Sequence, residues 1–287
     1  MKNYLSLVKF SHTIFALPFA LTGFFLAIAE GAEGVNWLLF MLVLGCMITA
    51  RSAAMAFNRW LDRDIDAANP RTKSREIPAG VVSAESALVF VVANCVLFVA
   101  ATWFINRLCF FLSPVALAVI LGYSYTKRFT WLCHFVLGLG LALAPVGAYL
   151  AVTGAFDWPP VLLGLAVLFW VSGFDIIYAL QDDDFDRSQH LHSVPVWLGR
   201  ARALRLSEVL HIGTAIFLLT ATWLIHNELP TASWLIWAGA GVFLVLLAYQ
   251  HFIVRPDDLS RVNLAFFTTN GVASLIFGSC AVLDFLM

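Results

Sequence analysis

Two short series of oxygen-bearing side chains have the same spacing in widely separated parts of the sequence. Residues in each series stand four positions apart: Asn58, Asp62 and Asp66 in the first, Tyr178, Asp182 and Asp186 in the second. We call these series the first and the second acidic ladder. Residues four apart lie on one face of a helix. Each ladder is therefore predicted to present its oxygens together on a single helix.

The four carboxylates of the ladders require a positive charge between them, because facing carboxylates would otherwise repel one another. Mg²⁺ is a hard cation that binds carboxylate oxygens together with substrate phosphates. Asn58 adds a neutral amide oxygen to the predicted metal ligands, which are Asp62, Asp66, Asp182 and Asp186. The ladders therefore predict a site for Mg²⁺ and a diphosphate.

Three basic residues follow the first ladder and are candidates for holding phosphate oxygens: Arg71, Lys73 and Arg75. Arginine can bind a phosphate through two hydrogen bonds, whereas lysine acts as a point charge. One isolated pair of aspartates four apart is more typical of a solvated helix end. Two ladders in the same register, each next to basic residues, favour a binding site.

Two further charged residues lie inside apolar stretches. Asp175 extends the second ladder inward, because positions 175, 178, 182 and 186 form one helical stripe. An acid within a membrane segment is a functional candidate, although it can also be paired with an interior arginine or a backbone group. Arg51 lies seven residues before Asn58 and shares its helical face. It could neutralise the acidic cluster or bind the anionic end of a second substrate.

The composition indicates an integral membrane protein. Of 287 residues, 61% are hydrophobic and 12% are charged, and the mean hydropathy is +0.86. A soluble domain of this size could not bury so much apolar surface. Apolar segments of about 20 residues suit a membrane span, and the sequence contains nine: 12–29, 35–57, 84–105, 108–125, 132–153, 159–180, 206–226, 231–253 and 263–286. We expect an all-α fold with nine transmembrane helices around a central cavity.

The basic residues predict the orientation of these helices. If the N-terminus is cytoplasmic, Arg107 alone lies outside and Arg51 lies within the second span. All the others fall on the cytoplasmic side, as the positive-inside rule requires: Lys2, Lys9, Arg59, Arg63, Arg71, Lys73, Arg75, Lys127, Arg128, Arg187, Arg200, Arg202, Arg205, Arg255 and Arg261. Both ladders then face the cytoplasm of a bacterial inner membrane, where Mg²⁺ and diphosphate metabolites occur.

The two loops that follow the ladders are longer than the other loops of the chain. Long loops with structure of their own usually carry function, and these could cap a cavity. The matching register of the ladders suggests an internal repeat, with helices 2–4 corresponding to helices 6–8. We expect one transmembrane domain over residues 1–287.

The paired ladders, placed after the second and sixth of nine spans, resemble those of the UbiA superfamily of membrane prenyltransferases. Further similarity lies in three segments, residues 12–18, 70–80 and 123–130. The chain is most similar to the 4-hydroxybenzoate polyprenyltransferase-like branch. Residues 174–182 and 191–193 look like the subset of the futalosine route to menaquinone. Asp182, Asp183 and Asp186 also match the DDxxD pattern of soluble prenyl synthases.

This resemblance implies transfer of a polyprenyl group from a polyprenyl diphosphate to an aromatic carboxylate, which is 4-hydroxybenzoate or a dihydroxynaphthoate, in the lipid bilayer. Mg²⁺ would be the cofactor, and the ladder carboxylates would serve catalysis by holding it. Asp175 would be the base or would orient the acceptor, and Arg51 or Arg128 would hold the acceptor carboxylate. Residues implied in substrate binding include Asn58, Arg71, Lys73, Arg75, Lys127 and Tyr178.

The sequence departs from the family pattern at two positions. Arg59 stands where many members carry an aspartate after the first asparagine, so a potential metal ligand becomes a cation. His192 stands where many members carry a lysine, a change that would weaken one contact to a diphosphate.

Two alternatives remain open at this point. Within the family, the acceptor could be haem or a chlorophyllide, and a panel of acceptors would distinguish these. From another class, the chain could be an ion-coupled transporter in which the acids relay a cation. Transporter sites usually lie near the middle of the membrane, whereas both ladders are predicted at its edge. A nucleic-acid partner is not expected.

Overall fold

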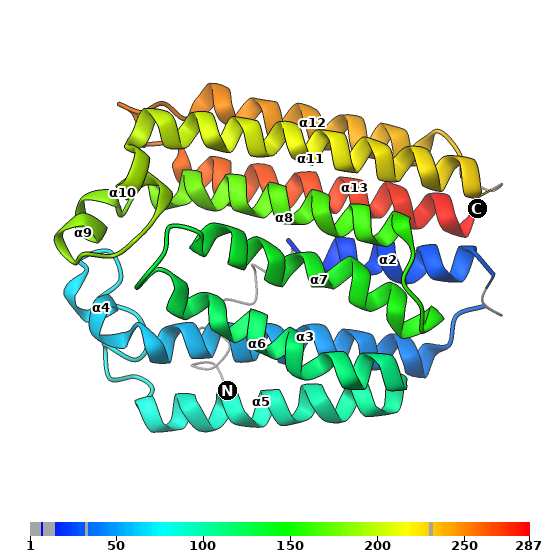
Figure 1. The fold of residues 1–287 in the computed structure, drawn as a ribbon, viewed down its shortest axis with the longest axis horizontal. Coiled ribbons are helices and arrows are strands. Elements are labelled where there is room, and N and C mark those ends of the chain that lie inside the picture. The colour runs from blue at the N-terminus through cyan, green and yellow to red at the C-terminus, as the bar shows by residue number, and fades with distance from the viewer. Residues whose placement is uncertain (1–6, 8–14, 32–33, 230–231) are drawn as a thin grey trace.

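The protein is an all-helical bundle, described by a computed structural model over residues 7, 15–31, 34–229 and 232–287 (Figure 1). The first half of the chain forms five long or medium helices: α2 (Leu17–Ala29), α3 (Trp37–Leu61), α5 (Ala84–Ile105), α6 (Arg107–Thr126) and α7 (Cys133–Thr153). The second half contributes α8 (Trp158–Ala179), α11 (Arg200–Glu228), α12 (Leu235–Ile253), the π-helix η2 (Leu264–Thr269) and α13 (Asn270–Leu286). The prediction of an all-α fold is therefore confirmed.

The number of spans is confirmed only in part. Eight helices in the described residues are long and apolar enough to cross a membrane, with η2 and α13 counted as one over Leu264–Leu286. The first predicted span, 12–29, corresponds to the shorter apolar helix Leu17–Ala29, and residues 12–14 lie outside the described part. Helix α11 begins at Arg200, six residues before the predicted start of that span at 206. Three basic residues of the predicted loop therefore belong to the helix: Arg200, Arg202 and Arg205.

Large apolar side chains cover the outer surface of the bundle. On α5, for example, Val89, Val96 and Phe104 are 69%, 61% and 73% exposed. A soluble protein rarely exposes such continuous apolar surface, whereas a bilayer solvates it. The chain is therefore a multi-pass membrane protein.

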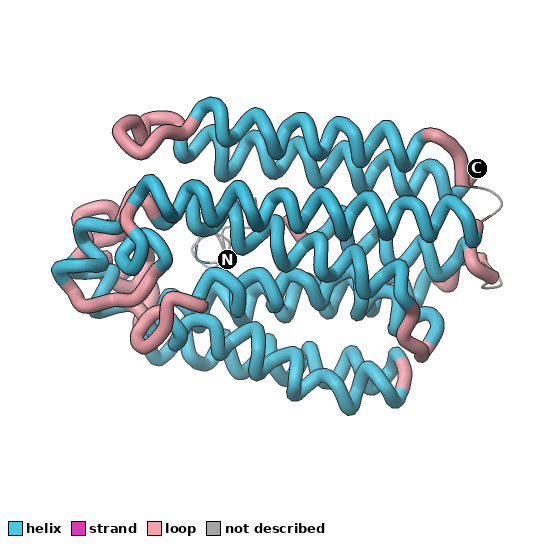
Figure 2. The backbone as a smooth tube through the Cα atoms, turned by 45° about the horizontal axis from the view of Figure 1, so that its top comes forward, coloured by secondary structure: helices cyan, strands magenta, loops and turns pink. Residues whose placement is uncertain are grey.

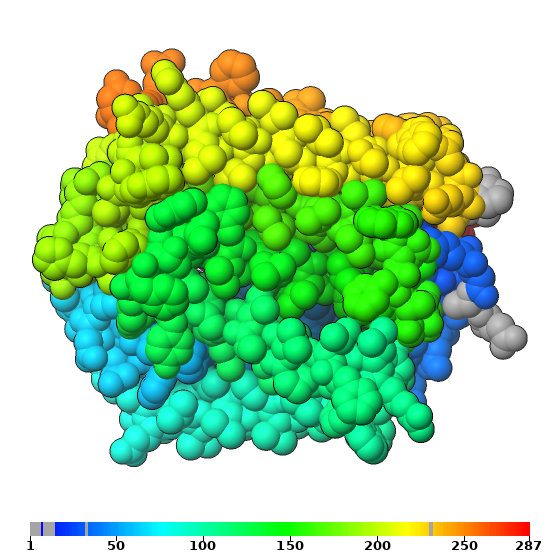
Figure 3. Space-filling model, in the orientation of Figure 1, coloured from blue at the N-terminus to red at the C-terminus, as the bar shows by residue number. Residues whose placement is uncertain are grey.

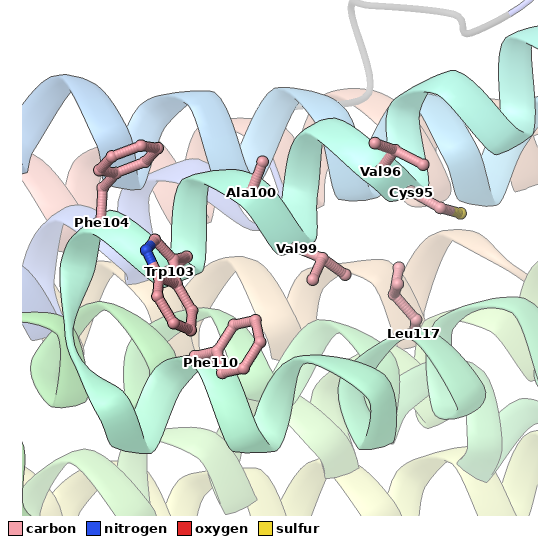
Figure 4. A pocket seen from close by; sticks show the side chains of 8 residues that line it. All are labelled: Cys95, Val96, Val99, Ala100, Trp103, Phe104, Phe110 and Leu117. Carbon is pink, nitrogen blue, oxygen red and sulfur yellow. The ribbon is translucent and has the colours of Figure 1, made fainter.

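A shallow groove runs along this outer surface between α5 and α6. Trp103 and Phe110 face one another across it, with ring centroids 4.8 Å apart, and Leu117 lies further along (Figure 4). Its lining is apolar apart from the Cys95 thiol and includes no charged side chain.

Glycines allow two pairs of helices to approach closely. A Cβ atom at Gly138 of α7 would lie 2.5 Å from the Leu168 carbonyl oxygen of α8. A Cβ atom at Gly23 of α2 would lie 2.1 Å from the Pro145 carbonyl oxygen of α7. Small residues at such crossings are typical of membrane bundles, because packing rather than water exclusion drives helix association in lipid.

Three short helices gather at one end of the bundle, which we call the capped end (Figures 1 and 2). They are α4 (Arg63–Ala68), α9 (Asp183–Ser188) and α10 (Val194–Leu198). The first belongs to the loop between α3 and α5, and the other two to the connection between α8 and α11. The two long loops predicted from the sequence thus lie together.

An apolar cavity of about 360 Å³ extends through the bundle between α3, α5, α6 and α7. It passes from Arg51 and Tyr123 at its polar end to Ala151 and Phe156. The surface is hollowed between α6 and α7 on the face shown in Figure 3.

Candidate active site

Both acidic ladders cross a junction between two helices. Asp62 ends α3 and precedes α4, and Asp182 stands between α8 and α9, so the prediction of one continuous helix for each ladder is wrong. The junctions share one backbone conformation, with φ −90° and ψ 6° at Asp62 and φ −112° and ψ 3° at Asp182. In both, the backbone amide of the last ladder residue donates to the carbonyl of the middle one at 2.7 Å, from Asp66 to Asp62 and from Asp186 to Asp182. The stripe predicted from Asp175 to Asp186 is broken in the same way after Ala179.

Asp62 is buried beside the two basic residues that directly follow α6. Lys127 Nζ lies 2.5 Å from its Oδ2, and Arg128 Nη1 lies 2.9 Å from its Oδ1 without the alignment of a hydrogen bond. Asn58 Nδ2 donates to Oδ2 at 3.0 Å. The amide of Asn58 therefore already serves the carboxylate of its own ladder, while two cations compensate the buried charge.

Asp66 is paired within its own loop. Arg75 Nη1 donates to both carboxylate oxygens, at 2.7 and 2.9 Å. The Thr72 hydroxyl donates to the backbone carbonyl of Asp66 at 3.1 Å. Arg75 thus closes the loop that follows the first ladder.

Asp182 is held by the loop that follows the other ladder. Arg71 Nε donates to its Oδ1 at 2.8 Å and Arg71 Nη2 donates to its Oδ2. Asn69 Nδ2 donates to Oδ1 at 3.1 Å. The third nitrogen of the guanidinium, Nη1, donates to the Tyr178 hydroxyl at 2.9 Å. One arginine therefore links the loop after the first ladder to two members of the second ladder.

Tyr178 is fixed on its other side by an aromatic contact that the sequence did not indicate. The Phe266 ring packs against it at a tilt of 31°, with centroids 4.1 Å apart. Phe266 lies in η2, whose widened turn is stabilised by Asn270 Nδ2, which donates to the Ala265 and Phe266 carbonyls at 2.9 and 3.1 Å. Single π-helical turns often occur at functional sites, and a π-helix leaves no signal in an apolar sequence.

Asp186 differs from the other ladder carboxylates because it makes no ion pair within the described residues. Burial and the nearby charge of Asp182 raise its pKa to about 6, against the opposing effect of Lys127. A carboxyl group with a raised pKa lacks sufficient positive charge nearby. Asp186 is thus the ladder member that a cation would stabilise most.

Asp175 forms a pair that the sequence did not predict. The partner is neither an arginine nor a backbone group but His134 of α7, whose Nδ1 lies 2.7 Å from Asp175 Oδ2. His134 stands 41 positions earlier in the chain and belongs to no regular pattern with the ladders.

Arg51 faces the apolar cavity. Its Nε is buried and makes no hydrogen bond within the described residues, and no ion pair there joins it to an acid. Tyr123 also lines the cavity and has Asp62, Asp175 and Arg51 as charged neighbours. The polar end of the cavity therefore adjoins the first ladder, and the predicted neutralisation of the ladder by Arg51 is not seen.

Three further basic residues lie in this region: Lys73 and Arg128 were predicted to bind substrate, and Arg59 replaces a potential metal ligand. Lys73 is exposed and makes no ion pair with any described residue. Arg128 donates to the Ser124 and Leu61 carbonyls at 3.1 and 3.0 Å, which directs it to Asp62 rather than to the cavity. Arg59 is 3% exposed, and its Nη1 has no hydrogen-bond partner among the described residues.

The middle aspartate of the DDxxD match has a structural partner. Arg200 donates to both oxygens of Asp183 through Nε and Nη2, at 2.8 and 2.7 Å. This buried carboxylate joins α9 to the start of α11, so it is engaged in holding the second loop.

The ladder carboxylates have the oxygen chemistry that Mg²⁺ prefers. In the part of the chain that the structure describes, no three Asp, Glu, His or Cys side chains surround one point, because lysine and arginine groups separate the carboxylates. One carboxylate nevertheless calls for a cation. Asp186 makes no ion pair with a described residue and has a raised pKa. Asp62 Oδ1, which accepts no hydrogen bond from the described residues, has only the poorly aligned Arg128 guanidinium at 2.9 Å. The donor set therefore fits a divalent cation.

Comparisons with known proteins agree with this fold and identify the family of the chain. The sequence model of the UbiA prenyltransferase family matches residues 16–272. A 4-hydroxybenzoate octaprenyltransferase from Tolumonas auensis is 32% identical over 241 residues, which cover 83% of this chain and 82% of the relative. Another from Aliivibrio salmonicida is 31% identical over 256 residues, covering 88% and 86%.

Solved structures show the same fold. The apo structure of a UbiA homologue from Aeropyrum pernix K1 superposes with a TM-score of 0.84 at 30% identity, over 95% of this chain and 98% of that one. A UbiA homologue from Archaeoglobus fulgidus, bound to GPP and Mg²⁺, has a TM-score of 0.73 at 21% identity, over 99% and 100%. The resemblance predicted from the sequence is thereby confirmed.

Proposed function

Because the chain belongs to the UbiA prenyltransferase family, we propose that it transfers a polyprenyl group from a polyprenyl diphosphate to an aromatic carboxylate in quinone biosynthesis. The observation that carries this proposal is the adjacency of two chemistries. Paired aspartates and their cations lie at the capped end. An apolar cavity lies directly next to them and contains Arg51, which makes no ion pair in the described part of the chain. An amphipathic substrate with a diphosphate and a long hydrocarbon tail needs both.

The diphosphate would bind at the ladders. Asp62, Asp66, Asp182 and Asp186, with Asn58, would hold Mg²⁺, which would neutralise the charge that develops on the departing diphosphate. Arg71 and Lys127 now pair with aspartates and are partly exposed. Both can turn from a carboxylate to a phosphate oxygen when substrate and metal arrive, and Arg75 lies within the same loop. These cations provide electrostatic stabilisation of the leaving group.

The hydrocarbon tail would lie in the cavity. Its lining is almost entirely apolar, with residues from α3, α6 and α7 along its length. Transfer of such a tail from water to an apolar site is favourable by roughly 25 cal/mol per Å², and the hollow between α6 and α7 gives the remainder of a long tail access to lipid.

The acceptor would bind between Arg51 and Asp175. Arg51, at the end of the cavity, makes no ion pair with any described residue, so an incoming carboxylate would supply the opposite charge. The relatives named as 4-hydroxybenzoate octaprenyltransferases favour 4-hydroxybenzoate over a dihydroxynaphthoate as the acceptor.

The reaction follows from this placement. The bond between the allylic carbon and the diphosphate oxygen breaks, and the electron pair leaves with the diphosphate. A ring carbon of the acceptor forms the new carbon–carbon bond to the allylic cation, and the ring then loses a proton. Asp175 has one oxygen on His134 and is placed to orient the acceptor or to take that proton.

A panel of acceptors tests this function. Purified protein in lipid vesicles would receive Mg²⁺, octaprenyl diphosphate and one acceptor at a time: 4-hydroxybenzoate, a dihydroxynaphthoate, haem or a chlorophyllide. We expect mass spectrometry to find 4-hydroxybenzoate carrying the prenyl group, with one diphosphate released per product. Prenylation of haem or chlorophyllide alone, or of no acceptor, would refute the proposal.

The orientation and the repeat belong to the same proposal. We infer a bacterial inner-membrane protein whose capped end faces the cytoplasm. It would form one domain over residues 1–287, in which the second to fourth predicted spans repeat as the sixth to eighth. Ser188 of α9 and Ala155, which follows α7, are both exposed and lie at opposite ends of the bundle. A membrane-impermeant thiol reagent added to intact cells should label Ala155→Cys and not Ser188→Cys. The reverse pattern would overturn the orientation.

A further inference from the structure

His134 connects the loop between α8 and α11 to Asp175, the acidic residue inside α8. The imidazole is 2% exposed and lies in the first turn of α7. Its Nδ1 is 2.7 Å from Asp175 Oδ2, and the Val194 backbone N–H donates to its Nε2 at 3.2 Å. Each ring nitrogen therefore has one partner, and the two partners come from different parts of the fold.

These contacts define the tautomer of the ring. A backbone N–H can only donate, so Nε2 must carry the lone pair that accepts it. The proton then resides on Nδ1 and is donated to the Asp175 carboxylate. Histidines that orient a carboxylate are commonly fixed through their second nitrogen in this manner. The loop thus determines which nitrogen faces Asp175.

The surrounding structure holds the ring in place. Gly138, one turn further along α7, permits the close approach to α8, because a Cβ atom there would lie 2.6 Å from Ser172 Oγ. On the loop side, Val194 begins α10, whose N-cap Ser193 accepts from the Val196 amide at 3.4 Å. The neighbouring His192 amide donates to the Lys127 carbonyl at 2.7 Å.

The contact leaves half of Asp175 available. Oδ2 is engaged by His134, while Oδ1 makes no hydrogen bond with any described residue. Tyr123, at the polar end of the cavity, has Asp175 among its charged neighbours. A carboxylate fixed through one oxygen has its second oxygen directed to a single place, which is what a group acting on a bound aromatic ring requires.

We infer that His134 is a positioning residue for prenyl transfer: it holds Asp175 through Nδ1–H so that the free carboxylate oxygen faces the acceptor. This inference rests on the proposed function. It goes beyond that function because it assigns a role to a residue outside the ladders and names the atom through which it acts.

Three variants of His134 separate the two contacts. Asparagine places its amide near the position of Nδ1 and can still donate to Asp175. Glutamine reaches to the position of Nε2 and can still accept from Val194, and phenylalanine keeps the ring and loses both bonds. We expect His134→Phe and His134→Gln to lower kcat/KM for the acceptor about 100-fold, and His134→Asn to remain within about fivefold of the wild type. Rescue by glutamine and not by asparagine would overturn the inference, because the loop contact would then be the essential one.

A double-mutant cycle with Asp175→Asn provides the readout that a merely structural role would not move. If His134 acts through Asp175, His134→Phe should cost less than about threefold in the Asp175→Asn background, because coupled residues are not additive. Fully multiplicative losses would contradict the inference. His211→Asn is the matched control. His211 is also buried and bonded through both nitrogens, to His251 at 2.7 Å and to the Trp170 carbonyl at 3.3 Å, so it should lower thermal stability without changing kcat/KM more than about twofold.

A measurement without catalysis distinguishes failure of this inference from failure of the proposed function. In protein labelled with ¹⁵N-histidine, the His134 resonances should show protonation at Nδ1, and Asp175→Asn should shift that resonance. A spectrum with the proton on Nε2, or one that Asp175→Asn leaves unchanged, would overturn the pair even if the enzyme is active. An inactive wild type with the expected spectrum would contradict only the proposed function.

Discussion

Arg71 binds both carboxylate oxygens of Asp182, although the two residues stand 111 positions apart. The arginine belongs to the loop after the first acidic ladder, and the aspartate belongs to the second ladder. The same guanidinium donates to Tyr178 and lies 5.3 Å from the centre of its ring. One side chain therefore joins the two halves of the candidate diphosphate site.

Replacing Arg71 by lysine should disrupt this junction even though the positive charge is kept. A lysine at position 71 keeps the charge but cannot form the paired bonds to Asp182 together with the bond to Tyr178. We expect Arg71→Lys to lower kcat/KM for the prenyl diphosphate by about 100-fold, which corresponds to about 2.7 kcal/mol. The steady-state rate at varied donor concentration measures this effect.

Lys73 provides the matched control. It lies in the same loop and is exposed without an ion pair among the described residues. Lys73→Gln should therefore change the same constant by less than about threefold, as surface charges usually contribute little. Equal losses from Arg71→Lys and Lys73→Gln would contradict a specific role for the bonds that the Arg71 guanidinium makes to Asp182 and Tyr178.

Asp186 should make stability depend on pH. Its pKa in the folded protein is about 6, above the ordinary value of 3.8, because of burial and the charge of Asp182. Between these values the folded state binds more protons than the unfolded state, so this group lowers stability as the pH rises. In the absence of Mg²⁺, Asp186→Asn should therefore raise the melting temperature more at pH 7 than at pH 5.

Asp184→Asn is the control for this effect. Asp184 lies two residues away in α9, and its side chain is 89% exposed, so its replacement should have a similar small effect at both pH values. A stabilisation by Asp186→Asn that is the same at pH 5 and pH 7 would contradict the raised pKa.

Arg51 should select acceptors that carry a carboxylate. Its guanidinium faces the cavity and makes no ion pair with a described acid. We expect Arg51→Gln to raise KM for 4-hydroxybenzoate at least about tenfold, the loss of one charge-assisted contact. KM for the prenyl diphosphate should remain within about twofold.

An uncharged acceptor sharpens this test. Wild-type protein should prefer 4-hydroxybenzoate to 4-hydroxybenzamide, and Arg51→Gln should abolish most of that preference. If both proteins discriminate between the two acceptors equally, the carboxylate does not bind at Arg51.

Gly138 should be sensitive to the addition of a single methyl group. A Cβ atom there would meet the Leu168 carbonyl oxygen at 2.5 Å and Ser172 Oγ at 2.6 Å. Overpacking of this kind costs about 1–3 kcal/mol, so Gly138→Ala should lower the melting temperature and reduce activity by separating α7 from α8. Gly241→Ala on α12 has no atom within 4 Å of its new Cβ, and it should be neutral or slightly stabilising. Equal melting temperatures for the two variants would contradict this close packing.

The sequence predicts the helices well because lipid imposes one simple requirement. Each segment must bury its backbone polar groups within a helix and cover them with apolar side chains, and a long apolar run suffices to show this. The ladders are visible for a related reason, since aspartates directly after an apolar run stand out. The family resemblance rested on these same residues.

Other parts of the site could not be predicted because they depend on contacts between distant segments. The pairing of His134 with Asp175 requires the close crossing at Gly138, and the bond from Arg71 to Asp182 requires two loops to meet at one end of the bundle. The helix breaks at Asp62 and Asp182 were missed because a spacing of four continues across a short junction. Regular spacing therefore indicated which residues matter but not the partner of each.

The central claim is that carboxylates of both ladders together support Mg²⁺-dependent prenyl transfer. The most direct test measures prenylated 4-hydroxybenzoate and released diphosphate in vesicles as Mg²⁺ is increased, for the wild type, Asp62→Ala and Asp182→Ala. We predict product and diphosphate in equal amounts for the wild type, a strict requirement for Mg²⁺, and a loss of at least about 100-fold in each variant. Full Mg²⁺-dependent activity in either variant would contradict the claim that both ladders form one site.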